Sequence, residues 1–146
     1  MPTEKVDFVG RRRARALIVQ GLYQYQLTKD PADSIWLHLL ESPNYSRCDK
    51  AYFDMLWRGV TSDCNDLLNT LSNFSDREIG SLSPVEQGVL LLGAWEMINR
   101  LEIPYKIIIN EAIDLAKIYG GTDGHKFVNG VLDKLAAKIR EREFNN

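Results

Sequence analysis

The fold is decided by one stretch of the chain, SPVEQGVLLLGAW, which runs from Ser83 to Trp95. Ser83 can cap a helix, Pro84 suits the first helical turn, and Glu86 stands three residues after the cap, as in a capping box. The helix expected from Pro84 to about Arg100 is apolar on nearly all sides through its middle. Because such a helix is usually enclosed by other helices, the sequence predicts a helical bundle with this segment at its centre.

Apolar residues three and four positions apart predict the other helices, and the alternation typical of strands is missing throughout. Pro104 opens one helix, and Gly120-Gly121 closes it in the left-handed conformation that glycine favours. Asp123 can cap the last helix. The expected helices, about six or seven, cover residues 9–27, 35–40, 50–74 (which Gly59 could divide in two), 84–100, 104–119 and 123–139. The sequence therefore predicts an all-α protein.

Length and composition indicate one globular domain. The chain has 146 residues, of which 45% are hydrophobic and 26% charged, as is ordinary for a soluble protein. Its longest apolar run, Val89 to Trp95, is far shorter than the roughly 20 residues that cross a bilayer, and the basic N-terminus is not a signal peptide. We expect a single compact domain over residues 1–146, located in the cytoplasm, with flexible ends at 1–8 and 141–146.

Nothing in the sequence predicts catalysis, a cofactor or a metal site. It lacks a glycine-rich phosphate loop, a nucleophile triad and an HExxH motif. Glu111 and Asp114 could act as acid and base, but such residues are more typical of a solvated helix face. Cys48 and Cys64 have no CxxC spacing, and we expect them to be reduced thiols.

Positive charge gathers at the N-terminus. Residues 1–20 carry a net charge of +3, although the whole chain has a formal net charge of −2. Four of these residues, Arg11, Arg12, Arg13 and Arg15, lie in the opening turns of the first helix, and their planar guanidinium groups match phosphate. This asymmetry favours nucleic-acid binding, and the alternative is a solvated charged surface.

A second unusual stretch, GGTDGHKFVNG, spans residues 120–130. It leads into a helix whose first turn presents Lys126 and Phe127. Free N–H groups and a lysine could hold a phosphate, and the phenylalanine ring could stack on an unpaired base. The alternative is that the glycines only cap helices and that Phe127 belongs to the core.

Four motifs together resemble the NusB family. They are RRRAR at 11–15 with GLY at 21–23, PVEQ at 84–87, IPYKIIINEA at 103–112, and KFVNGVLDK at 126–134. The resemblance implies an all-α fold of two packed helical bundles. It also implies binding of boxA, a short single-stranded RNA element of ribosomal-RNA and phage leader transcripts, together with the ribosomal protein NusE. With other Nus factors, this complex would join elongating RNA polymerase and promote antitermination.

The resemblance also carries over site residues by position. The implied RNA-binding residues are Arg11, Arg12, Arg13, Arg15, Tyr23, Asp123, Lys126 and Phe127. The implied partner-protein surface includes Glu86. Asp123 could accept hydrogen bonds from base edges or merely cap its helix. Some family members form homodimers and others are monomers, and the sequence leaves this open.

Two other functions compete with this interpretation. The same helical domain occurs as a module of ribosomal-RNA cytosine methyltransferases, which need a downstream Rossmann-like domain; we expect that alternative to fail if residues 1–146 are the whole protein. The second alternative is a purely protein-binding adaptor, in which the arginines are solvated surface. RNA affinity that is undetectable even with the partner present would support it.

Overall fold

The computed structural model describes residues 5–121 and 123–146. Over these ranges the chain is all-helical, as predicted, with eight α-helices rather than six or seven. They are α1 (Phe8–Thr28), α2 (Ala32–Leu39), α3 (Lys50–Ser62), α4 (Cys64–Ser72), α5 (Pro84–Asn99), α6 (Tyr105–Tyr119), α7 (Gly124–Ile139) and α8 (Glu141–Phe144). Two short 3-10 helices, η1 (Tyr45–Arg47) and η2 (Ile79–Ser81), lie in the connections.

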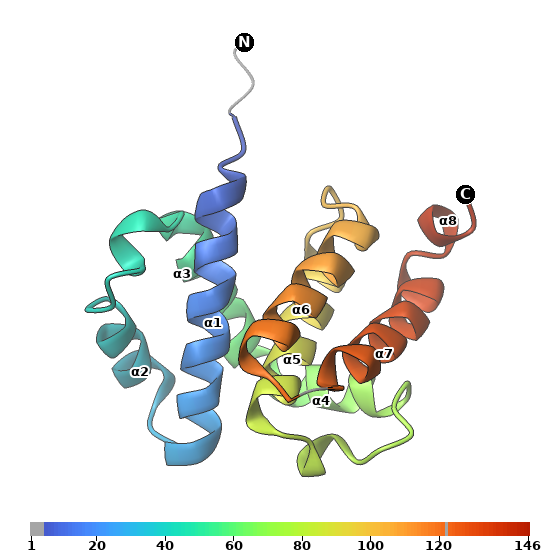
Figure 1. Ribbon diagram of the computed structural model, residues 1–146, viewed down its shortest axis with the longest axis horizontal. Helices are drawn as coiled ribbons and strands as arrows, with labels where there is room; N and C mark the ends of the chain where they lie inside the picture. Colours follow the sequence, from blue (N-terminus) through green and yellow to red (C-terminus); the bar gives the residue numbers. More distant parts are fainter. Residues whose placement is uncertain (1–4, 122) are drawn as a thin grey trace.

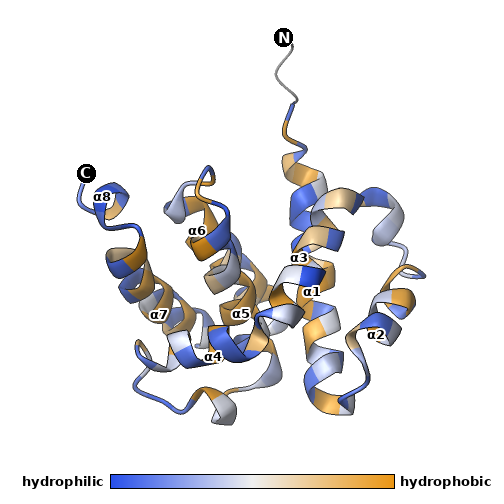
Figure 2. Cartoon of the chain, turned by 180° about the vertical axis from the view of Figure 1, so that it is seen from behind, coloured by the Kyte–Doolittle hydropathy of each residue, from blue (hydrophilic) through white to orange (hydrophobic). Residues whose placement is uncertain are grey.

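The helices form two groups that pack against each other, which confirms the expected pair of bundles. In Figure 1, α1, α2 and α3 lie on one side, and α4 to α8 lie on the other. Helix α5 joins the groups because it contacts α1, α3, α4, α6 and α7. Every residue from Gly88 to Met97 is buried, and Figure 2 shows apolar residues along α5 and the helix faces around it. The prediction of a central apolar helix is therefore confirmed.

Local sequence signals set the starts of two helices. The Ser83 hydroxyl accepts a hydrogen bond from the N–H of Glu86 at 3.2 Å, as expected for the start of α5. The Asp7 carboxylate does the same for α1, accepting from the N–H of Gly10 at 2.8 Å. Phe8 is therefore the first residue of a capped helix, whereas we expected residues 1–8 to be flexible; residues 1–4 of that range lie outside the described residues.

The long segment after residue 50 breaks at Asp63, not at Gly59. The Asp63 carboxylate accepts a hydrogen bond from the Trp95 indole N–H at 3.2 Å. Gly59 lies inside α3, where a Cβ atom would be 2.3 Å from the Trp95 ring. Its role is to let the indole approach the helix, so a glycine that appeared to be a helix breaker is a packing site.

The C-terminal residues, where we expect a flexible end, contain a short helix. Residues Glu141–Phe144 form α8. The Arg140 guanidinium donates hydrogen bonds to the carbonyls of Met97 and Ile103 at 2.9 and 3.0 Å and pairs with Glu143 at 2.7 Å. It satisfies a carbonyl group in the last turn of α5 and another in the connection to α6. This buried arginine therefore anchors the C-terminal turn to the central helix.

The end of α6 shows another departure. Gly120 closes α6 with φ −98° and ψ −176°, which is extended backbone and not the predicted left-handed conformation. The left-handed cap belongs instead to Lys29, with φ 56°, after α1. Both cysteines are free thiols, and burial raises the pKa of each. In the described ranges, none of the helices has the length and apolar character required to cross a membrane.

Candidate nucleic-acid interface

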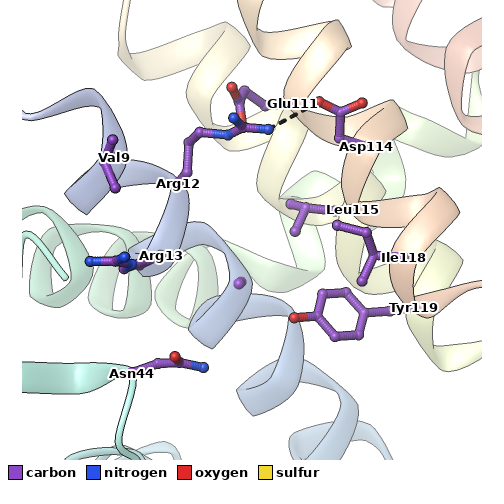
Figure 3. Close-up of a pocket in the computed structure, with 10 residues that line it drawn as sticks. Val9, Arg12, Arg13, Asn44, Glu111, Asp114, Leu115, Ile118 and Tyr119 are labelled. Carbon is purple, nitrogen blue, oxygen red and sulfur yellow. Dashed lines mark hydrogen bonds and ion pairs between the residues drawn. The ribbon is translucent and has the colours of Figure 1, made fainter. Parts of the chain in front are cut away.

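The arginines at the start of α1 differ in their contacts and in their exposure to solvent. Arg12 reaches α6, where its Nε lies 3.2 Å from Glu111 Oε2 and its Nη2 lies 3.2 Å from Asp114 Oδ2 (Figure 3). Its side chain is still 55% exposed. Arg13 donates a 3.4 Å hydrogen bond to the carbonyl of Arg47. Both guanidinium groups therefore remain available to a ligand on the surface between α1 and α6.

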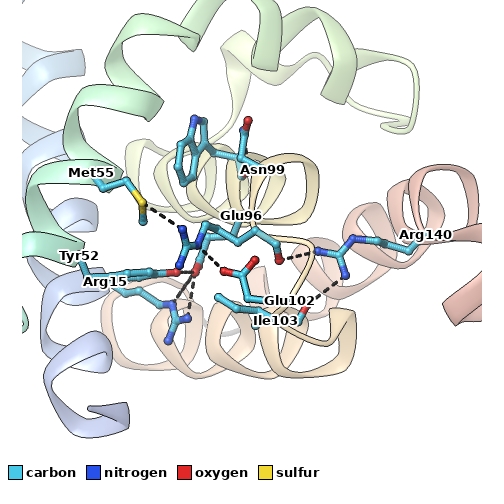
Figure 4. Close-up of polar contacts among 10 residues, drawn as sticks. Arg15, Tyr52, Met55, Glu96, Asn99, Glu102, Ile103 and Arg140 are labelled. Carbon is cyan, nitrogen blue, oxygen red and sulfur yellow. Dashed lines mark hydrogen bonds and ion pairs between the residues drawn. The ribbon is translucent and has the colours of Figure 1, made fainter. Parts of the chain in front are cut away.

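Arg15, in contrast, is buried, and this corrects its expected place on an RNA-binding face. Its Nε and Nη2 donate to the two carboxylate oxygens of Glu96, each at 2.9 Å (Figure 4). The Tyr52 hydroxyl donates to the same carboxylate. Burial alone would lower the pKa of Arg15, but the hydrogen bond and charge of Glu96 raise it overall, so this arginine stays charged. It serves the fold and has no access to a phosphate.

Arg11 is intermediate in exposure between Arg12, which is exposed, and Arg15, which is buried. Its Cζ atom is 4.4 Å from the centre of the Tyr52 ring, a cation–π geometry. Its Nε is buried and has no hydrogen-bond partner within residues 5–121 and 123–146. Arg11 as a whole residue is only partly exposed. Arg11 therefore adds positive electrostatic potential to the surface. It is less suited to a direct contact with a phosphate, because its side chain is stacked on Tyr52.

Two adjoining hollows run between α1 and α6. Arg12, Arg13, Ile118 and Tyr119 help to line the first, which has a volume of about 350 Å³ (Figure 3). The second, of about 390 Å³, is lined by Val19, Gln20, Tyr23, Val85 and Tyr119. Because Tyr119 borders both, they form one groove, here called the α1–α6 groove. The exposed or partly exposed residues that line it are the two carboxylates Glu111 and Asp114 together with Val9, Arg12, Arg13, Ala16, Gln20, Tyr23, Asn44, Val85, Ile118 and Tyr119.

A separate patch lies at the N-terminus of α7. Asp123 precedes the helix but makes no side-chain capping bond, and its carboxylate lies 3.5 Å from the ammonium of Lys126. Phe127 is partly buried against the core, and the guanidinium of Arg77 lies 4.7 Å from its ring centre. The structure thus brings together the three residues expected here and adds Arg77, which the sequence did not single out. This set is the α7 patch.

Glu86 offers a partner protein little surface. Glu86 is only 8% exposed. It packs against the first turn of α7, where a Cβ atom on Gly124 would lie 2.5 Å from Glu86 Oε1. A carboxylate near a helix N-terminus is stabilised by the helix dipole. Its position thus links the start of α5 to the start of α7.

Sequence analysis missed Tyr119, which borders both hollows and is 50% exposed. Tyr119 stands four residues after Leu115 and continues the buried stripe of α6, so the spacing did not mark it as an exposed ring, whereas Ile118 beside it is out of register with the stripe. Both residues face α1, so the hollow that they line can be recognised only from the packing of α1 against α6.

These features define an all-helical protein whose exposed cations and aromatic rings lie along a groove between two helices, a class suited to unpaired nucleic acid. The sequence profile of the NusB family matches residues 12–137. The chain belongs to the NusB family.

Curated relatives cover nearly the whole chain. A transcription antitermination protein NusB of Ralstonia nicotianae is 46% identical over 133 residues, which are 91% of this chain and 86% of the relative. A protein of the same name from Nitrosomonas eutropha is 49% identical over 136 residues, 93% of this chain and 81% of the relative.

Solved structures share the fold. NusB of T. maritima has a TM-score of 0.81 with 27% identity, and each chain is covered in full. A NusB chain from a complex of NusB and NusE with double-stranded RNA has a TM-score of 0.74 at 21% identity, over 94% of this chain and 98% of that one. This second likeness shows the fold alone.

Proposed function

We propose that this protein is a non-catalytic, RNA-binding transcription antitermination factor. In this proposal it binds boxA RNA of ribosomal-RNA and phage leader transcripts together with NusE. The resulting complex joins elongating RNA polymerase and other Nus factors in the cytoplasm. The proposal is supported by family membership, by relatives named transcription antitermination proteins, and by the solved complex of NusB, NusE and RNA.

The observation that carries the proposal is the α1–α6 groove. Arg12 and Arg13 line one end, and Tyr23 and Tyr119 line the other. Single-stranded RNA is held by cations along its backbone and by aromatic side chains on which bases stack. The groove supplies both kinds of group side by side.

The proposed RNA contacts therefore differ from the set that the sequence implied. Arg11, Arg12, Arg13 and Tyr23 stay in the set, and Arg15 leaves it because it is buried. The α7 patch of Asp123, Lys126, Phe127 and Arg77 forms a second contact region. Glu86 remains in the proposal as a residue beneath the partner-protein surface, where it positions the start of α7.

Fluorescence anisotropy of a labelled boxA-type RNA and a scrambled RNA, each with and without NusE, tests the proposal. We expect boxA to bind selectively and NusE to tighten the complex. With about three phosphates neutralised, the plot of log K against log salt should have a slope near −2. Equal, weak binding of both RNAs that NusE leaves unchanged would contradict the proposal and favour a protein-binding adaptor.

A further inference from the structure

A hollow between α2 and α3 lies on a different face of the molecule from the α1–α6 groove. It has a volume of about 620 Å³ and is lined by Asp33, Trp36 and Leu37 from α2 and by Trp57 and Arg58 from α3. In Figure 1, α2 lies at the edge of the α1–α3 group, with α1 between it and α6. These five residues are called the α2–α3 face.

The walls of this hollow are apolar. Trp36 is partly exposed and donates its indole N–H to Asp54 Oδ1 at 2.8 Å; Trp57 is buried and donates to the carbonyl oxygen of Ala32 at 3.0 Å. Because both N–H groups already have acceptors, the rings offer only hydrophobic surface to the hollow. Leu37 is 58% exposed beside them. An apolar side chain that projects into water therefore adjoins an apolar hollow.

The two charged residues of the α2–α3 face have opposite signs. Asp33 lies on α2 and Arg58 on α3, and both are exposed. Among residues 5–121 and 123–146, neither forms an ion pair. Both charges are thus free to pair with an approaching molecule. A matching surface needs one cation, one anion and a projecting apolar side chain.

A second copy of this chain carries that same set. In a twofold-symmetric contact both copies use one patch, so that each pair of facing residues occurs twice. Because the acid lies on α2 and the base on α3, a twofold axis between these helices sets α2 of each copy over α3 of the other. Asp33 then faces Arg58 of the other copy in two equivalent pairs, and each Leu37 reaches the other copy's hollow.

We propose that the α2–α3 face is the contact surface of a symmetric dimer of this protein. A contact built around one hollow is at the small end of protein interfaces, so the dimer is weak and exchanges with the monomer. The α1–α6 groove stays open in both copies. This inference goes beyond the proposed function and does not depend on it.

Charge reversal tests the contact, and sedimentation equilibrium up to millimolar protein measures the dimer dissociation constant. Asp33→Arg and Arg58→Asp should each raise that constant by about 5- to 30-fold, because symmetry makes one substitution break two exposed ion pairs. The double variant Asp33→Arg with Arg58→Asp should recover most of the wild-type affinity. In an equimolar mixture of the two single variants, every facing pair again has opposite charges, so the mixture should associate more tightly than either variant alone.

Two further variants serve as a probe of the hollow and as a control. Leu37→Glu places a charge against the apolar walls and should abolish association. Asp66→Arg is the matched control for Asp33→Arg, because both are exposed aspartates in the first turn of a helix, and Asp66 lies on α4, outside the α2–α3 face. It should leave the dissociation constant unchanged. Thermal denaturation of each variant shows whether it is folded.

The outcomes separate this inference from the proposed function. A wild-type protein that stays monomeric at millimolar concentration overturns the dimer. A dimer that Asp33→Arg and Asp66→Arg weaken equally, without recovery in the double variant, uses another surface and also overturns it. Leu37→Glu should bind boxA RNA with wild-type affinity in either case. If the dimer behaves as expected but boxA is not bound selectively, the proposed function alone fails.

Discussion

Replacing Arg15 by methionine tests whether this arginine stabilises the fold instead of binding RNA. The Arg15 and Glu96 side chains are 5% and 2% exposed, and the guanidinium donates to both carboxylate oxygens. The variant leaves the Glu96 carboxylate buried, with the Tyr52 hydroxyl as a neutral donor. Removing one partner of a buried ion pair costs about 3–5 kcal/mol in unfolding free energy.

The expected loss is large enough for standard assays. At roughly 2–4 °C per kcal/mol for a protein near this size, Arg15→Met should lower the Tm by about 6–20 °C. Thermal and urea denaturation, followed by circular dichroism, measure the change. The double variant Arg15→Met with Glu96→Leu should be more stable than Arg15→Met alone, because no unpaired charge remains in the core.

RNA binding gives the second half of this test. At a temperature where Arg15→Met is folded, its RNA affinity should show the same salt dependence as the wild type, because Arg15 contacts no phosphate. A slope reduced by about 0.7 would indicate the loss of one phosphate contact and refute the structural assignment. If Arg15→Met lowers the unfolding free energy by less than about 1 kcal/mol, and the double variant is no more stable than Arg15→Met, the Arg15–Glu96 pair does not stabilise the fold as proposed.

Four further substitutions test other contacts of the fold and of the groove. Gly59→Ala should destabilise the fold by about 1–3 kcal/mol because its Cβ would lie 2.3 Å from the Trp95 ring; Gly130→Ala, with open space around it in α7, should stabilise it by about 0.5–1 kcal/mol, and urea midpoints measure both. Burial acts to raise the pKa of Glu143, but the hydrogen bonds that its carboxylate accepts lower it overall. Its contribution to stability is therefore complete above the ordinary glutamate pKa of about 4.3 and is lost as pH falls through the lower folded value, so Glu143→Gln should flatten this part of the stability profile in acid denaturation. Arg12→Ala should reduce the slope of log K against log salt by about 0.7 for boxA RNA, and an unchanged slope would remove this arginine from the phosphate contacts.

Local chemistry made the central helix predictable. Ser83 and Pro84 fix where α5 begins, and the apolar residues that follow require burial. The break after α3 was not predictable in the same way. Gly59 has the local character of a helix breaker, yet it lies inside α3 against the ring of Trp95, which is distant in sequence and whose indole N–H donates a hydrogen bond to Asp63.

The burial of Arg15 could have been recognised from the sequence. It precedes Ile18 by three residues and Leu22 by seven, so it lies on the buried stripe of the first helix. Glu96 is a single carboxylate inside the apolar central helix and needs a cationic partner. Tyr119 is different, because the hollow that it lines exists only when α1 and α6 pack together.

Photochemical cross-linking of a boxA-type RNA carrying 4-thiouridine, with NusE present, tests the central claim most directly. Mass spectrometry then identifies the cross-linked peptides. The account predicts cross-links on α1 between Arg12 and Tyr23 and on the last turn of α6 at Tyr119, with none at Leu37 on α2. Cross-links concentrated on α2 and α3, with none along the α1–α6 groove, would contradict it.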